Sequence, residues 1–301
     1  MLAVSTQLWW IFSARFLDRA GKGLRTAPRD ALLSDETTAA DKGTVFGFHR
    51  MMDTFGAVLG PLIALLYLYF YPGAYKTLFL LAFIPGIAAI VFTFLVNEKK
   101  STAAPKKTIP FHQTFAYWKK ASYPFKQLVI GLVLFALFNS SDVFLLLKMK
   151  ETGLSDTMVI AVYIFYNLVF ALFAFPLGKL ADKIGMKNIL LTGLIFFCIT
   201  YVGFAFSKSV MFFWFLFFCY GIYAAATEGI AKAWISNLVP KNETASAIGL
   251  FTGLQSIAAL IASSVAGLLW FRFGPSIVFI LSAMITFLAL LWIAFRLSNQ
   301  K

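Results

Sequence analysis

Residues 178–187 read Gly-Lys-Leu-Ala-Asp-Lys-Ile-Gly-Met-Lys, a short basic segment between two long apolar runs at about 157–177 and 189–206. Each run is long enough to cross a bilayer as a helix, which takes roughly 20 residues. Glycine permits a tight turn and a close approach between helices. Asp182 can accept from a helix N-terminus or pair with a basic residue. The stretch therefore predicts two membrane-spanning helices joined by a tight polar loop.

The same pattern extends over the whole chain of 301 residues, which is 60% hydrophobic and only 13% charged. A soluble domain is about a quarter charged, so a soluble enzyme and a disordered chain are both excluded. The apolar runs are continuous rather than alternating, which excludes a β-barrel. We predict an all-α membrane protein with nine transmembrane helices, at about 6–33, 45–70, 77–96, 128–147, 157–177, 189–206, 209–236, 245–270 and 275–296.

Basic residues are distributed unevenly between the two sets of loops. One set holds 14 Lys and Arg and the other holds 5, and seven of the 14 lie in the basic linker 97–127. The side rich in Lys and Arg is cytoplasmic in membrane proteins, so we expect a cytoplasmic C-terminus. This asymmetry also accounts for the net charge of +13 without a nucleic-acid partner. We expect an integral protein of a bacterial inner (plasma) membrane, with the lipid bilayer as its partner.

An internal repeat divides the chain. When the sequence is shifted by 202 residues, Ser34 aligns with Ser236 and Gly47 aligns with Gly249, without a gap. The first two spans thus match the fourth and fifth spans after the linker. We therefore predict a partial N-terminal half over 1–96, the linker over 97–127 and a complete six-helix half over 128–301. On this reading three N-terminal spans are absent, and we expect a missing N-terminal segment.

The segment 178–187 resembles the cytoplasmic loop signature of the major facilitator superfamily, G-x-L-a-D-[RK]-x-G-x-[RK]. This resemblance implies two six-helix halves around a central mid-membrane cavity. It also implies a gating role, rather than substrate contact, for Gly178, Asp182, Lys183, Gly185 and Lys187.

A second motif resembles the fifth-span antiporter motif of the same family, G-x8-G-x3-G-P-x2-G-G. It comprises Gly47, Gly56, Gly60 and Pro61, but Ala64-Leu65 replaces the final glycine pair. The resemblance implies an antiporter. The residues themselves equally suit close helix packing and a proline bend.

Charged side chains within the membrane cost several kcal/mol each unless they face a partner or water, so they mark the working surface. At about 100° per residue, Arg15, Asp18, Arg19 and Lys22 share one face of the first span. We predict that this stripe borders the aqueous cavity. The cations favour an anionic or zwitterionic substrate, unless Asp18 cancels their charge.

Further polar side chains fall in other spans. Asp53 can pair with Arg50 three residues earlier, and Asp142 shares a face with Asn139. Glu228 and Lys232 are one turn apart and form either a static ion pair or a proton-operated switch. Asp142 and Glu228 are candidate proton sites, and Tyr220 and Tyr223 are candidate aromatic walls of the cavity.

These observations predict a secondary transporter that moves a small solute by alternating access, coupled to protons and operating as an antiporter or efflux permease. A proton-coupled uptake symporter and a truncated product that does not transport are the alternatives. The sequence contains no HExxH, Cys/His cluster or phosphate-binding loop, so we expect no enzyme, no metal and no cofactor.

Overall fold

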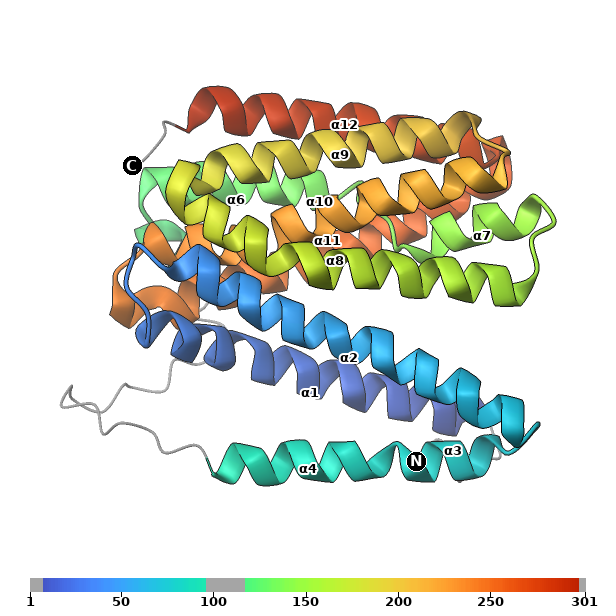
Figure 1. Cartoon of the computed structure of the whole chain (residues 1–301). Helices are drawn as coiled ribbons and strands as arrows, with labels where there is room; N and C mark the ends of the chain where they lie inside the picture. Colours follow the sequence, from blue (N-terminus) through green and yellow to red (C-terminus); the bar gives the residue numbers. More distant parts are fainter. Residues whose placement is uncertain (1–7, 96–116, 298–301) are drawn as a thin grey trace. The chain divides into compact units, whose positions relative to one another are not determined.

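The computed structural model describes residues 8–95 and 117–297, and the regular structure in this part of the chain is helical (Figure 1). The principal helices, in chain order, are α1 (Leu8–Asp35), α2 (Lys42–Phe70), α3 (Tyr75–Leu81), α4 (Phe83–Phe94), α6 (Tyr123–Ala136), α7 (Val143–Glu151), α8 (Asp156–Ile184), α9 (Met186–Phe206), α10 (Val210–Asn237), α11 (Thr244–Phe273) and α12 (Pro275–Arg296). A 3-10 turn, η2 (Lys241–Glu243), precedes α11.

Seven helical segments of the described chain are long and apolar enough to cross a membrane. The predicted count of nine is therefore not confirmed. Helix α1 coincides with the first predicted span but is not among the seven, because charged residues recur along it. Helix α6 has only 14 residues, which is too short to cross alone.

The span predicted at 128–147 is interrupted. Helix α6 ends at Ala136 and α7 begins at Val143 (Figure 1). The six residues between them include Asn139-Ser140-Ser141-Asp142, whose side chains compete with the helix for backbone hydrogen bonds. The Ser141 hydroxyl accepts from the backbone N–H of Val143 at 3.4 Å. Irregular backbone at membrane depth is tolerated where protein or a water-filled cavity surrounds it. This break is therefore a candidate functional position.

The span predicted at 77–96 is also divided, because α3 ends and α4 begins on either side of Ala82. Pro85 has no N–H to donate to the carbonyl four residues earlier, which explains the interruption of the helical hydrogen bonds there.

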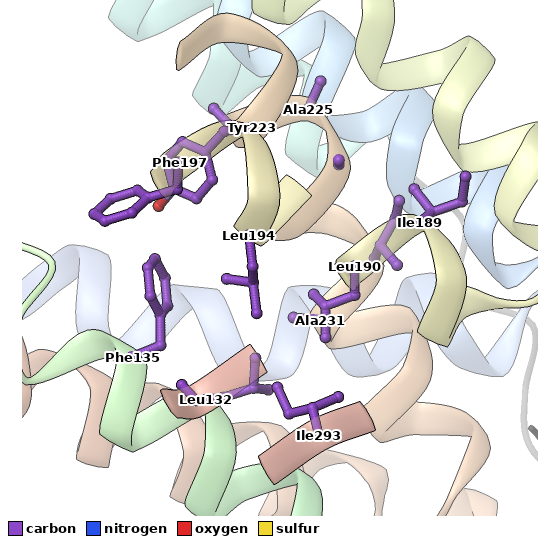
Figure 2. Close-up of a cluster of buried hydrophobic side chains, with 14 of the residues drawn as sticks. Leu132, Phe135, Ile189, Leu190, Leu194, Phe197, Tyr223, Ala225, Ala231 and Ile293 are labelled. Carbon is purple, nitrogen blue, oxygen red and sulfur yellow. The ribbon is translucent and has the colours of Figure 1, made fainter. Parts of the chain in front are cut away.

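The chain forms two compact units. One comprises residues 1–25 and 59–110, and the other comprises residues 26–58 and 111–301. Within the second unit, α10 packs against α8 and α9, and α12 packs against α9 and α6. Buried side chains from α6, α9, α10 and α12 fill the space between these helices, among them Leu132, Leu194, Phe197 and Ile293 (Figure 2). The division at the linker stays a prediction.

The end of the predicted linker joins this second unit. Tyr117 is buried and its ring makes an edge-on contact with Phe125 of α6, with ring centroids 5.6 Å apart. Burial and a hydrogen bond to Glu243 raise the pKa of Tyr117 above its usual range. Helix α6 itself begins at Tyr123, inside the segment predicted as linker.

Candidate functional site

The first residues of α2 are held by Asp182 from the end of α8. The Asp182 carboxylate accepts from the backbone N–H of Gly43 at 2.8 Å and from that of Thr44 at 2.7 Å. The Thr44 hydroxyl adds a third bond at 2.6 Å. Free N–H groups and the helix dipole favour an anion at this position. Of the two partners predicted for Asp182, the structure shows the helix N-terminus.

Small residues let α2 and α8 cross closely beside this contact. A Cβ atom on Gly47 would lie 2.5 Å from the carbonyl oxygen of Ala174, and one on Gly178 would lie 2.3 Å from that of Gly43. Both distances are too short for non-bonded atoms, and the atoms met are backbone, which cannot rotate away. Gly178 of the first motif and Gly47 of the second therefore meet in a single helix crossing.

The other members of the first motif lie around the same loop. Gly185 has φ of +97°, a conformation that favours glycine, and it separates α8 from α9. Lys187 donates to the carbonyl oxygen of Ala294 at 2.8 Å and to that of Leu297, at the end of α12. Lys183 is exposed. The gating role of this motif stays a prediction.

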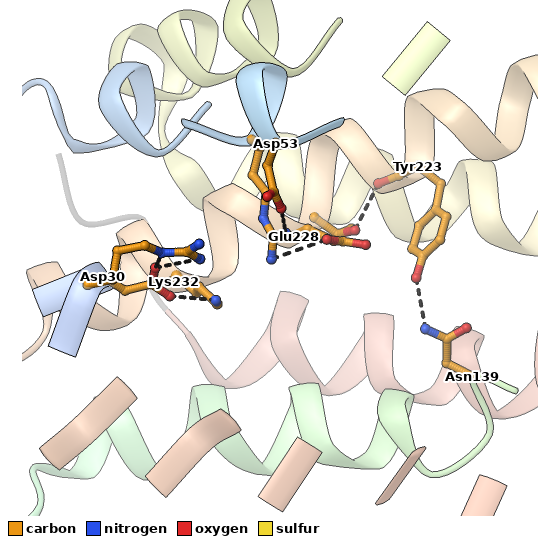
Figure 3. A network of polar contacts seen from close by, with 9 residues as sticks. Asp30, Asp53, Asn139, Tyr223, Glu228 and Lys232 are labelled. Carbon is orange, nitrogen blue, oxygen red and sulfur yellow. Dashed lines mark hydrogen bonds and ion pairs between the residues drawn. The ribbon is translucent and has the colours of Figure 1, made fainter. Parts of the chain in front are cut away.

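A buried ion pair joins α1 to α10. Lys232 Nζ lies 2.5 Å from the carboxylate of Asp30, and the two side chains are 6% and 1% exposed (Figure 3). Arg29 contacts the same carboxylate at 3.2 Å. Two cations thus share one buried anion, so removal of the Asp30 carboxylate would leave two positive charges without compensation.

A second set of charges lies one turn earlier on α10. Arg50 of α2 contacts Glu228 at 3.3 Å and Asp53 at 3.3 Å (Figure 3). The expected Arg50–Asp53 pair is therefore present. The expected Glu228–Lys232 pair is wrong as a description of this structure, because each residue takes its partner from another helix. Local spacing allowed that pair, but packing against α1 and α2 supplied other partners.

Two hydrogen bonds to backbone carbonyls extend these contacts. Lys42 Nζ donates to the carbonyl oxygen of Ser236 at 2.7 Å, and Asn237 Nδ2 donates to that of Ala39 at 3.2 Å. We call the whole set the polar interface. It comprises Asp30, Lys42, Gly43, Thr44 and Arg50 on one side and Asp182, Glu228, Lys232, Ser236 and Asn237 on the other. It joins helices that precede the linker to helices that follow it.

A third polar group lies nearer the N-terminal end of α10 than Glu228, where this helix meets the α6–α7 break. Tyr166 of α8 donates to the carboxylate of Asp142 at 3.2 Å. Asn139 donates to the hydroxyl of Tyr223 at 2.9 Å (Figure 3). The ring of Tyr220 lies 5.2 Å from that of Tyr166 and 5.2 Å from that of Tyr223. The predicted residues Asp142, Tyr220 and Tyr223 therefore belong to one cluster.

Other predicted residues are not brought together. No described atom lies within 4 Å of a Cβ placed on Gly56 or Gly60, and α2 continues through Pro61. Helix α1 includes Arg15, Asp18, Arg19 and Lys22, but their side chains lie outside what the structure describes. The cationic stripe remains a prediction.

Sequence reasoning missed Asp30 as a partner of Lys232. Asp30 is nevertheless among the most buried charged residues that the structure describes. One signal was available, because the repeat offset of 202 residues aligns Asp30 with Lys232.

Comparison with known proteins supplies the context for this geometry. Residues 1–149 and 128–301 match the profile of the Major Facilitator Superfamily. An uncharacterised MFS-type transporter of Methanocaldococcus jannaschii is 34% identical over 291 residues, which cover 95% of this chain and 71% of that protein. A Lactococcus lactis homologue of the multi-drug resistance efflux pump PmrA is 22% identical over 284 residues, covering 90% of this chain and 68% of its own length. The crystal structure of the human organic anion transporter MFSD10 superposes with a TM-score of 0.70 at 14% identity, over 97% of this chain and 72% of that one, which indicates a shared fold.

Proposed function

Because the chain belongs to the Major Facilitator Superfamily, we propose that it is a secondary transporter that carries a small solute across a lipid bilayer by alternating access. The single observation that carries this proposal is the polar interface. Its contacts join α1 and α2 to α8 and α10 and lie toward the helix ends that the distribution of loop charges predicts to be cytoplasmic. Rocking of the two sets of helices would have to break these contacts, so the interface would close one side of the transport path.

The contacts of the interface suit repeated opening. Asp182 caps the α2 N-terminus through a few hydrogen bonds, and Lys42 and Asn237 bind carbonyl oxygens that water could bind instead. The Asp30–Lys232 pair differs, because its charges are buried when closed and would be hydrated when open. Such a pair contributes little net stability and fixes one arrangement of the helices, which is the property a two-state gate needs.

Proton coupling is proposed to act through Glu228 and Asp142. The Glu228 side chain is 42% exposed, so protons can reach it, and its carboxylate neutralises Arg50. Protonation of Glu228 would remove that attraction and favour the open interface. A solute that moves against the proton flow would then be exported. The resemblance to an efflux pump homologue supports export over uptake.

Proteoliposomes containing the chain and trapped pyranine, a pH-sensitive dye, test both steps. The probes are a panel of amino acids, sugars, carboxylates and amines added under an imposed pH gradient. We expect at least one solute to move together with protons, and we expect Glu228→Gln to abolish the effect of the gradient on its flux. Asp53→Asn is the matched control, because Asp53 contacts the same arginine as Glu228 but lies on α2 with it, so this pair does not join two helices. Unchanged proton-driven flux in Glu228→Gln and in Asp142→Asn would contradict the coupling assignment. The absence of any solute or proton movement would contradict transport.

A further inference from the structure

The acidic side chains of the second unit differ in what neutralises them. Asp30 contacts Lys232, Glu228 contacts Arg50, and Asp182 accepts from the start of α2. Asp142 forms no ion pair among residues 8–95 and 117–297, and its carboxylate accepts from the hydroxyl of Tyr166. An ionisable side chain at membrane depth without a countercharge marks a functional site.

Several tyrosine side chains lie near this carboxylate. We define the tyrosine cluster as Tyr163, Tyr166, Tyr220 and Tyr223. The ring centroids of Tyr163 and Tyr166 are 5.5 Å apart. The ring centroid of Tyr220 lies 5.2 Å from that of Tyr166 and 5.2 Å from that of Tyr223. Tyr163 is half-buried, whereas the other three rings are buried. The face of an aromatic ring attracts a cation through its quadrupole.

The contacts form a closed circuit that begins and ends at the α6–α7 break. From Asp142 they run through Tyr166, Tyr220 and Tyr223 to Asn139, which lies on the same break. The break itself has left the helical hydrogen-bond pattern. In membrane transporters such interruptions border substrate sites, because irregular backbone is stable only against protein or a wet cavity.

One acceptor in this circuit lacks a donor. The Oδ1 atom of Asn139 is buried and accepts no hydrogen bond from the described residues, although Nδ2 of the same amide donates to Tyr223. A buried amide oxygen without a donor costs free energy, so a ligand N–H placed there would be favoured. Asn139 Oδ1 and the Asp142 carboxylate are both hydrogen-bond acceptors, so this position favours a ligand that carries N–H donors.

On the basis of the transport function proposed above, we propose that the transported solute carries a protonated amine, bound at the α6–α7 break by Asp142, Asn139 and the tyrosine cluster. The ammonium N–H groups donate to the Asp142 carboxylate and to Asn139 Oδ1, and the rings of Tyr163 and Tyr220 contact the charge and its apolar substituents. An anion is disfavoured here, because it would face a carboxylate, an amide oxygen and the negative faces of aromatic rings. A neutral solute would leave Asp142 without a countercharge.

Isothermal titration calorimetry of the full chain in lipid nanodiscs tests this assignment, with nanodiscs free of protein as the baseline. The probes are 4-phenylbutylamine, 4-phenylbutan-1-ol and 4-phenylbutanoate, which share a skeleton and differ in charge. We expect the amine to bind at least about tenfold more tightly than the other two, since a hydrogen bond to a charged group is worth about one to two orders of magnitude in affinity. Asp142→Asn should abolish that preference. Asp156→Asn, which removes an exposed carboxylate paired with Lys150, should keep it.

A second pair of variants covers the case in which Asp142→Asn does not fold. Tyr220→Phe keeps the ring and should bind the amine as the parent chain does, whereas Tyr220→Leu should weaken binding by about threefold or more. Equal binding of the three probes, no binding above the baseline, or an amine preference that survives in Asp142→Asn would overturn the proposal. Calorimetry does not require transport, so failure of flux with intact amine binding rejects the transport function alone. Solute-coupled proton flux without amine binding rejects this inference alone.

Discussion

Asp30 and Lys232 form a buried ion pair at 2.5 Å, and they are separated by 202 residues, the same offset that aligns the two parts of the internal repeat. Each residue therefore contacts its own equivalent position in the other repeat. In a two-fold arrangement, positions that contact their own equivalents lie next to the axis. The pair thus marks the place where the repeat-related helices α1 and α10 meet, with a carboxylate on one and an ammonium group on the other.

Removal of one partner of this pair should be more harmful than removal of both. We expect Asp30→Asn to lower the free energy of unfolding by about 3 kcal/mol, because Lys232 then remains buried beside Arg29 without an anion. Lys232→Met should cost less, since Asp30 keeps Arg29. The double variant should be more stable than the sum of the two single effects. Unfolding in mixed detergent micelles, read as a double-mutant cycle, measures the coupling.

The matched control is the exposed pair of Lys150 and Asp156, whose side chains are 50% and 73% exposed. Coupling there should be below about 1 kcal/mol. Additive effects at Asp30 and Lys232, or coupling no larger than in the control, would show that the buried pair does not act as a unit.

The glycines of the second motif should differ sharply in their tolerance of a methyl group. Gly47→Ala places a Cβ 2.5 Å from the carbonyl oxygen of Ala174, so α2 and α8 must separate, and we expect a lower melting temperature. Gly56→Ala meets no described atom within 4 Å and should be neutral or stabilising, by up to about 1 kcal/mol from helix propensity. Thermal unfolding of both variants in the same detergent decides the matter. Equal losses in the two variants would contradict the observed crossing.

Lys187 should protect the C-terminal end of α12. Its ammonium group binds the carbonyl oxygens of Ala294 and Leu297 at the C-terminal end of α12, where a cation is favoured. In Lys187→Met we expect the amides of the last turn of α12 to exchange hydrogen several-fold faster, with little change at the centre of that helix. Hydrogen-exchange mass spectrometry in nanodiscs measures this. The exposed neighbour, in Lys179→Met, should leave the exchange of that turn unchanged. Unchanged hydrogen exchange of that turn in Lys187→Met would refute the capping role.

Much of the fold could be predicted because it depends on the length and continuity of apolar runs. Helices occur at each of the nine segments predicted, although only seven helical segments qualify as spans. The two interruptions were harder to predict. Apolar residues continue through Ala82, whereas the backbone responds to Pro85. At the α6–α7 break, four polar residues ending at Asp142 interrupt an otherwise apolar segment. Local hydrogen-bonding chemistry, not hydrophobicity, ends these helices.

The candidate site was only partly predictable, for a related reason. Helical spacing indicates which residues share a face, and the rings of Tyr220 and Tyr223 lie 5.2 Å apart on α10. Asn139 and Asp142 were expected on one face of a span, but both lie in the break between α6 and α7. Spacing says nothing about the helix on the opposite side. Glu228 and Lys232 therefore seemed to be partners until tertiary contacts assigned them to Arg50 and Asp30. The segment expected before Met1 and the stripe from Arg15 to Lys22 stay predictions.

We predict that the contact between Asp182 and the start of α2 opens and closes during transport. Double electron–electron resonance in nanodiscs tests it, with spin labels at Ala40 and Lys183, which are exposed on opposite sides of that contact, and with Cys198 and Cys219 replaced by alanine. We predict a short and a long distance in exchange, and in Asp182→Asn a roughly tenfold shift toward the long one, because the amide loses the charge-assisted bonds to Gly43 and Thr44. Asp156→Asn should not change the distribution. A single distance that is the same in the parent chain and in Asp182→Asn would show that this contact does not open.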